Sequence, residues 1–201
     1  MIAYKLTDSK YQTYNNTQWG VNITHEVNVK KAKPELCSPD VIHYYKTPTL
    51  ALLLNPTHAN IDNPIIWECE ADQEAAADYG KSGCYSLTTK KIIKTQITDT
   101  QMHRIMIRFA ILCAESALKY FADKYPNDDR PKKAIEAAKE YLSGKIVTNA
   151  AAADAAYAAA DAANAAYAAA YAAYAAKAQI PDFNILANQA FKEEFNNEKA
   201  F

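Results

Sequence analysis

The chain has 201 residues, with 22 Lys and Arg against 23 Asp and Glu, so its formal net charge is −1. That length can bury a substantial core, either as one large domain or as two small ones. Nucleic-acid-binding proteins usually carry a clear basic excess, so the charge balance disfavours nucleic acid as a partner. Only four glycines are present, and none forms a GxGxxG or GxxxxGK phosphate-binding loop.

The chain has four cysteines and no CxxC pair: Cys37, Cys69, Cys84 and Cys113. No apolar run follows Met1 that is long enough for a signal peptide. We therefore expect reduced thiols, no cofactor and a cytoplasmic location, which is the host cytoplasm if the chain is viral. Residues 150–178 are long enough to cross a membrane, but Asp154 and Asp161 would each disfavour insertion by roughly 2.5–3.5 kcal/mol. We expect no membrane-spanning segment.

The first half, residues 1–97, contains short β-rich runs bounded by Asn, Pro, Gly and Asp, as is typical of strands joined by turns. Strands are predicted over residues 2–7, 18–23, 41–46, 65–70 and 85–95. The apolar run 49–54 is predicted to be a short helix. It should end at Asn55-Pro56, because a residue before proline disfavours the helical conformation.

The second half, residues 98–201, is predicted to be helical almost throughout. Thr98 and Gln101 have the spacing of a capping box, and apolar residues then recur with a helical period. Asp128-Asp129-Arg130-Pro131 marks a second helix start, with a carboxylate at the cap, and that helix should end near Ser143-Gly144. A last helix is predicted from Phe183 to about Asn196. The sequence thus predicts an α+β protein, with an antiparallel-rich β module over 1–97 and a helical bundle over 98–201.

Residues 150–178 should form one very long helix of the bundle, since 21 of these 29 residues are alanine. At the ideal helical pitch, seven of the other residues fall within an arc of roughly 160°. Several of them repeat every seven residues, which indicates a seam against another helix. Six are the predicted partner-binding residues: Tyr157, Asp161, Asn164, Tyr167, Tyr171 and Tyr174.

Two interpretations of this tyrosine stripe compete. Tyrosine buries far more area than alanine, so the stripe can be ordinary internal packing against the rest of the protein. Alternatively, exposed and regularly spaced tyrosine rings would make a good protein-binding or dimer-forming surface. The seven-residue spacing predicts a homo-oligomer formed through the helical half.

Aromatic, histidine and acidic residues of the first half, with two arginines of the second, are candidates for a ligand pocket: Trp19, His43, Tyr44, His58, Trp67, Glu70, Arg104 and Arg108. His58 follows Asn55-Pro56 and is predicted to be a turn histidine that bonds to the backbone. Arg104 and Arg108 lie one turn apart on a predicted helix. They could clamp an anion, but ion pairs with acidic residues of a neighbouring element are the stronger expectation.

Three catalytic or metal arrangements have suitable residue types, but the sequence disfavours each of them. The set His25, Cys37, His43 and His58 has the right residue types for a metal, but no spacing of a metal motif supports a site. Cys37 and His43 could form a nucleophile pair but lack a local signature. Glu68 and Glu70 could act as acid and base, although alternate carboxylates on an edge strand are usually solvated surface.

Several short motifs are distinctive in their order: Tyr4-Lys5-Leu6-Thr7, Trp19-Gly20, Leu36-Cys37, His43-x-Tyr45, Leu52-Leu53-Leu54-Asn55-Pro56-x-His58-Ala59 and Trp67-Glu68. This first half resembles a domain family encoded mainly by bacteriophages and prophages. Two further motifs, with the Ala/Tyr-rich segment, make the second half similar to immunity proteins: Phe109-Ala110-x-x-Cys113-Ala114-Glu115 and Tyr125-Pro126-Asn127-Asp128-Asp129-Arg130-Pro131. The resemblance implies a small accessory protein of viral or mobile-element type, and it carries over no catalytic residue.

These observations favour a non-enzymatic interaction protein that neutralises a partner by binding, as a phage anti-defence or immunity-type inhibitor does. The partner would be a host defence protein or a toxin, and a small signalling ligand is an open alternative. A second hypothesis is an NAD-binding enzyme similar to ADP-ribosyltransferases, with His43, Tyr44 and Glu70 in its cleft. A third is a structural component of a virion.

Overall fold

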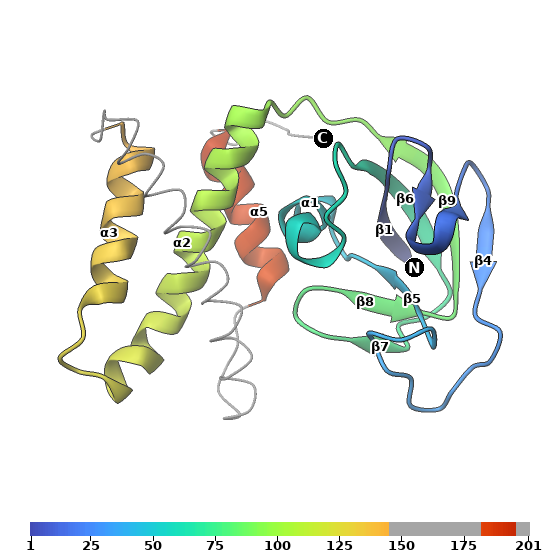
Figure 1. Cartoon of the computed structure of the whole chain (residues 1–201), viewed down its shortest axis with the longest axis horizontal. Helices are drawn as coiled ribbons and strands as arrows, with labels where there is room; N and C mark the ends of the chain where they lie inside the picture. The colour runs from blue at the N-terminus through green and yellow to red at the C-terminus, as the bar shows by residue number, and fades with distance from the viewer. Residues whose placement is uncertain (145–181, 196–201) are drawn as a thin grey trace. The chain divides into compact units, whose positions relative to one another are not determined.

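The computed structural model describes residues 1–144 and 182–195 of the chain (Figure 1). The chain divides between Gln96 and Ile97 into two compact units. The first unit consists mainly of strands and the second of helices, so the α+β prediction is confirmed. The predicted long alanine-rich helix and its tyrosine stripe lie outside the described residues.

A four-stranded antiparallel sheet forms the centre of the N-terminal unit, with the strand order β1-β6-β9-β4 (Figure 1). Its strands are β1 (Ile2–Thr7), β6 (Ile65–Ala71), β9 (Ser86–Ile93) and β4 (Thr24–Glu26). The register places Ala3 opposite Cys69 and Lys5 opposite Trp67. Because neighbours in register share a face of the sheet, Lys5 lies on the same face as these three residues.

A second sheet of three antiparallel strands has the order β5-β8-β7. It contains β5 (Ile42–Tyr44), β8 (Ser82–Cys84) and β7 (Ala76–Ala77). Tyr4 and Tyr45 exchange backbone hydrogen bonds of 2.9 and 2.8 Å, which join β1 to the end of β5. The two sheets are therefore linked beside the position of Lys5.

The short strand β8 was not predicted, and it depends on Gly83. A Cβ atom at this position would lie 2.5 Å from Cγ2 of Val41 and 2.7 Å from its Cβ. Such approaches are too close for any side chain, so only glycine allows β8 to pair with β5 here. Three residues of β8 were too few to give a periodic signal.

A short hairpin precedes the sheet strand β4. It contains β2 (Gln12–Thr13), the 3-10 turn η1 (Tyr14–Asn16) and β3 (Thr17–Gln18). The predicted strand 18–23 is therefore wrong, since β3 ends at Gln18 and β4 begins only at Thr24. Asn22 has a φ of 60° and Ile23 donates to the Gly20 carbonyl over 3.2 Å, so a turn interrupts the run.

Helix α1 (Pro48–His58) begins at Thr47, whose side chain accepts from the Leu50 amide. The prediction that this helix ends at Asn55-Pro56 is wrong, because Pro56 lies inside the last turn. The Asn55 side chain donates to the Ile61 carbonyl over 2.9 Å and accepts from the Ile61 amide over 3.1 Å. These bonds hold the last turn in place although Pro56 cannot donate a helical hydrogen bond.

The core of the N-terminal unit gathers inward residues of both sheets together with Trp19, which follows β3: Ala3, Trp19, Tyr44, Trp67, Cys69, Ala71, Cys84 and Leu87. The Trp67 indole donates to the Thr7 hydroxyl over 3.1 Å, which satisfies its polar atom inside the core. Three of the cysteines are buried and Cys37 is exposed, and all four are free thiols.

The helical unit contains α2 (Asp99–Lys124), α3 (Arg130–Leu142) and α5 (Phe183–Glu194), with α2 between the other two (Figure 1). The predicted capping box at Thr98 and Gln101 is present, and α3 ends at Ser143-Gly144 as predicted. Asp129 does not cap α3 with its side chain. Instead, the Asp128 carboxylate accepts the Arg130 amide over 3.1 Å.

Apolar contacts join α2 to both neighbours. Ile107 and Ile111 pack against Ile135 and Ala138 of α3. On the other side, the rings of Phe109 and Phe183 meet edge to face with centroids 5.9 Å apart. Among residues 1–144 and 182–195, no helix combines the length and the apolar character that crossing a membrane requires.

Candidate functional site

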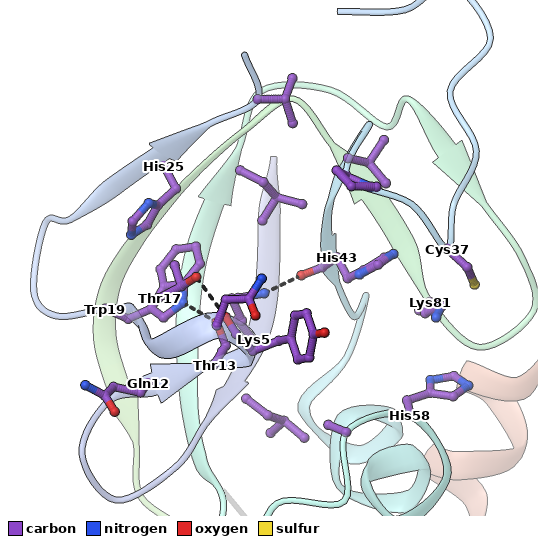
Figure 2. Close-up of a pocket in the computed structure, with 18 of the residues that line it drawn as sticks. Lys5, Gln12, Thr13, Thr17, Trp19, His25, Cys37, His43, His58 and Lys81 are labelled. Carbon is purple, nitrogen blue, oxygen red and sulfur yellow. Dashed lines mark hydrogen bonds between the residues drawn. The ribbon is translucent and has the colours of Figure 1, made fainter. Parts of the chain in front are cut away.

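A cavity of about 860 Å³ opens in the N-terminal unit (Figure 2). Its wall comes from β1, the β2–β3 hairpin, the end of β4 and the residues after it, the segment before β5, β5 itself and the end of α1. A volume of this size lies within the range of ordinary small-molecule sites, roughly 300–1,000 Å³.

Lys5 enters this cavity from the middle of β1 (Figure 2). Its ammonium group donates to the His43 carbonyl over 2.9 Å and lies 4.9 Å from the ring centroid of Trp19. Burial lowers the pKa of Lys5 from 10.5 to about 8, and the nearby thiols of Cys69 and Cys84 oppose this shift only in part. Among the described residues, no carboxylate is one of the groups that shift the pKa of Lys5.

Trp19 forms one wall of the cavity together with the hairpin. It is only 2% exposed, and its indole donates to the Thr13 hydroxyl over 2.9 Å. The His25 ring packs on it with centroids 4.4 Å apart, and His25 Nε2 lies 2.8 Å from the Gln18 carbonyl oxygen. The indole is thus held rigidly between Lys5 and His25.

A second pair of rings stands at the end of α1. Tyr45 and His58 are stacked with centroids 6.0 Å apart and an interplanar angle of 15°. The Tyr45 hydroxyl lies 3.4 Å from Nδ1 of His58. Burial, helped by the charge of Lys81, lowers the pKa of His58 from 6.5 to about 4, so His58 is neutral near pH 7.

His43 lies on β5 with its ring directed toward the segment before that strand (Figure 2). Its Nε2 is hydrogen-bonded to the Leu36 carbonyl. Burial lowers the pKa of His43 as well, although the bond to Leu36 opposes the shift. Because Nε2 is engaged by a carbonyl, this nitrogen carries a proton and cannot serve as a base toward Cys37.

The structure brings together only part of the predicted pocket. Trp19, His43 and His58 line the cavity. Tyr44 and Trp67 are 0% and 1% exposed and belong to the core. Successive side chains of a strand point to opposite faces, so His43 lines the cavity while its neighbour Tyr44 points into the core.

Glu70 and Glu68 lie away from this cavity, and the prediction that they sit on an edge strand is wrong. Their strand β6 lies between β1 and β9. Glu70 forms an ion pair with Lys90 at 2.8 Å and Glu68 one with Lys91 at 3.3 Å. His43, Tyr44 and Glu70 thus do not converge on one cleft, and the structure offers no support for the NAD-binding arrangement.

Residues that the sequence analysis missed include Lys5, Tyr14, Tyr45 and Lys81, all of which line the cavity. Lys5 had a detectable signal, because it stands at an inward position of β1 between Ala3 and Thr7, both fully buried. A lysine in the buried phase of a strand is unusual. Across residues 1–144 and 182–195, no three His, Cys, Asp or Glu side chains are grouped as a metal ion would require.

Arg104 and Arg108 lie in the helical unit and bind one carboxylate of α5. Arg104 Nε donates to Glu194 Oε1 over 2.8 Å, and Arg108 Nε donates to Oε2 over 3.0 Å. Arg104 also donates to the Leu142 carbonyl at the end of α3 over 3.1 Å. The expected ion pairing with a neighbouring element is confirmed, and these side chains tie the three helices together.

A shallow hollow of about 410 Å³ lies on this helical unit. It is bordered by Arg108, Leu112 and Glu115 of α2, by Lys139 of α3 and by Gln189 of α5, among others. Lys139 forms an ion pair with Glu115 at 2.5 Å across it. The predicted partner-binding residues from Tyr157 to Tyr174 lie outside the described residues, so the structure does not test them.

The fold thus defines a two-unit α+β protein, with a small-molecule-sized cavity in one unit and, among the described residues of the other, three tightly connected helices. Residues 96–182 match the family model described as Imm-5 like putative immunity protein. The match includes α2 and α3 and ends just before α5. No curated protein and no solved structure matches the chain.

Proposed function

We propose that this chain is an immunity-type protein that neutralises a protein partner by binding it through its helical unit. The observation that carries the proposal is the match of residues 96–182 to an immunity-protein family model. The partner is a toxin or a host defence protein, and a phage or prophage origin, as the first half suggests, is part of the proposal.

The described helices support a binding role because they are held in one arrangement before any partner arrives. The capping box fixes the start of α2, and the carboxylate of Glu194 holds two arginines of that helix. A preorganised surface loses little conformational entropy on binding, so more of its contact energy remains as affinity.

The tyrosine stripe is the part of the chain that we assign to the partner. Tyr157, Tyr167, Tyr171 and Tyr174 are spaced so that a helix would present them along one side. Tyrosine is enriched among the residues that dominate protein interfaces. The same stripe can join two copies of the chain, so we also propose a homo-oligomer.

The test of the proposal is whether the chain protects cells from a partner protein, and not only whether it binds one. Proteins crosslinked to the full chain in cells that carry its gene are identified, and each is expressed with and without the chain. We expect growth arrest by one of them to be relieved by the wild-type chain. The variant with alanine at Tyr157, Tyr167, Tyr171 and Tyr174 should lose both protection and binding.

A matched control replaces Tyr120 and Tyr125 of the same unit by alanine. These two tyrosines are 44% and 47% exposed. This variant should protect fully. Equal protection by the stripe variant and the wild type would assign the stripe to internal packing. Incorporation of the chain into virus particles without any protected toxin would instead support a structural role. Light scattering decides the oligomer, since a molar mass of one chain contradicts it.

A further inference from the structure

We propose that the cavity of the N-terminal unit binds a small anion that carries a planar ring, of the nucleotide class, with Lys5 contacting the anionic group. This inference concerns the part of the chain outside the family match and does not depend on the proposed immunity function. Lys5, the rings around it and the size of the cavity each contribute to the argument.

Lys5 is a half-buried cation, and its contacts within the described residues include no negatively charged group. An ammonium group has three N–H donors. Within the described residues, one N–H of Lys5 donates to the His43 carbonyl, and the ammonium nitrogen lies 4.9 Å from the centroid of the Trp19 ring. A carbonyl and a ring compensate a buried charge less well than an anion does, and buried charges in proteins are usually paired.

The carboxylates that line the cavity are already engaged. Asp8 Oδ1 accepts the backbone amides of Lys10 and Gln12 over 2.9 and 2.7 Å. Glu26 accepts from the Ser86 hydroxyl over 3.4 Å. Within the described residues, neither Asp8 nor Glu26 forms an ion pair. An anion from solution could therefore bind Lys5 without displacing a carboxylate of the protein.

A second lysine lies at another part of the wall. Lys81 lines the cavity beside His58 (Figure 2). It is close enough to His58 and His43 for its charge to lower the pKa of each. Both histidines remain neutral near pH 7, so the positive charge available to a ligand comes from the two lysines.

Aromatic rings account for the planar part of the ligand. Tyr14 lines the cavity and is 88% exposed, although an exposed ring gains nothing from the hydrophobic effect. His25 also lines the cavity and packs on Trp19. A planar ring that enters the cavity at Tyr14 would cover this exposed side chain and stack on its face, as bases do on aromatic platforms, for roughly 1–3 kcal/mol by general precedent.

The four histidines of the chain provide a direct measurement. His25, His43 and His58 line the cavity, while His103 lies on α2 in the other unit. Proton NMR of the imidazole signals is recorded on the full chain during titration with AMP. We expect the three cavity histidines to shift and His103 to stay in place, with calorimetry giving the affinity.

Ligand and protein variants separate the two contacts. Adenosine lacks the anion and inorganic phosphate lacks the ring, so each should bind at least about tenfold more weakly than AMP, a difference that affinity arithmetic resolves well. Nicotinate is titrated in parallel and distinguishes a nucleotide from an aromatic carboxylate. Lys5→Met should lower AMP affinity at least about tenfold, and Lys90→Met on the surface of β9 should leave it unchanged.

Tyr14→Ala should weaken AMP binding while leaving phosphate binding unchanged. Lys5→Gln serves as a second variant if the methionine variant does not fold. The proposal is overturned if no probe binds more tightly than about 1 mM, or if both Lys5 variants fold and keep wild-type affinity for AMP. It is also overturned if the signal of His103 shifts while the cavity histidines do not. None of these outcomes bears on protection by the helical unit.

Discussion

Replacing Lys5 by methionine should stabilise the N-terminal unit at neutral pH, because it removes a buried charge and keeps an unbranched side chain that is only one atom shorter. The pKa of Lys5 is about 8 in the folded chain against 10.5 for an ordinary lysine. Holding the proton on Lys5 inside the fold therefore disfavours folding by about 3 kcal/mol at pH 7. The lost hydrogen bond to His43 and the lost ring contact offset about 1–2 kcal/mol of the gain.

The dependence on pH distinguishes this explanation from better packing of methionine. Between pH 8 and pH 10.5 the unfolded chain keeps the Lys5 proton while the folded chain releases it, so stability rises with pH in this interval. The cost of the charge falls to about 2 kcal/mol at pH 9 and about 1 kcal/mol at pH 10. The advantage of the methionine variant should therefore shrink by about 2 kcal/mol between pH 7 and pH 10.

The assay is urea unfolding followed by tryptophan emission. Both tryptophans of the chain, Trp19 and Trp67, lie in the N-terminal unit, so the signal reports that unit within the full protein. Burial raises the pKa of Cys69 and Cys84 to about 12. These thiols reduce the stability of both variants above pH 9, and their effect largely cancels in the difference.

Lys90→Met is the matched control, because Lys90 is paired with Glu70 at 2.8 Å on the surface. It should change stability by about 0.5 kcal/mol or less at either pH. The reasoning is refuted if the advantage of Lys5→Met is the same at pH 7 and pH 10. A variant less stable than wild type at pH 7 would likewise refute it.

Three further measurements follow from the same structure. Thr98→Ala removes the capping box and should lower the stability of the helical unit by about 1 kcal/mol in far-UV circular dichroism, and an unchanged midpoint would contradict the cap. Glu194→Gln removes the carboxylate that Arg104 and Arg108 share, leaves Arg108 only its 3.5 Å pair with Glu193, and should cost about 2 kcal/mol. Glu193→Gln changes a carboxylate that is 42% exposed and should cost almost nothing, and equal losses would refute the assignment. Because the pKa of His58 is about 4 when folded and 6.5 when unfolded, stability should fall by as much as about 3 kcal/mol from pH 6.5 to pH 4. His58→Gln should remove this loss in tryptophan emission, and a loss that persists in the variant would assign it to other groups.

The sequence predicted those elements whose signals are local. The capping box at Thr98 and Gln101 involves residues three positions apart, and the ends of α3 and α5 depend on proline, glycine and cap residues beside them. Strands β1 and β6 carry six and seven residues, enough for alternation to be read. The apolar period likewise predicted α2 because it extends over many turns.

The elements that the sequence did not predict depend on contacts between distant residues. Strand β8 has three residues, and it can form because Gly83 has no side chain and leaves room for that of Val41, which is distant in the sequence. The last turn of α1 continues through Pro56 because Asn55 binds the backbone of Ile61. A local rule such as the effect of proline on its predecessor gives the average preference, and such side-chain bonds can overcome it.

The candidate site was only partly predictable for the same reason. Residue type alone selected Trp19, His43 and His58 correctly, together with Tyr44 and Trp67, which belong to the core. Type does not reveal which face of a strand a side chain occupies when the strand has three residues. Pairing of strands decides this question, and pairing is set by the whole fold.

The place where the family match begins links the two proposals. The match starts at residue 96, and the compact helical unit starts at Ile97, so the similarity to immunity proteins begins where the N-terminal unit ends. The cavity with Lys5 therefore lies wholly outside the matched part. If protection depends on the helical unit alone, Lys5→Met will weaken AMP binding and leave protection intact. If the cavity ligand instead controls the partner, the same substitution will weaken protection although the helical unit is unchanged, and AMP will alter protection by the wild type but not by the variant.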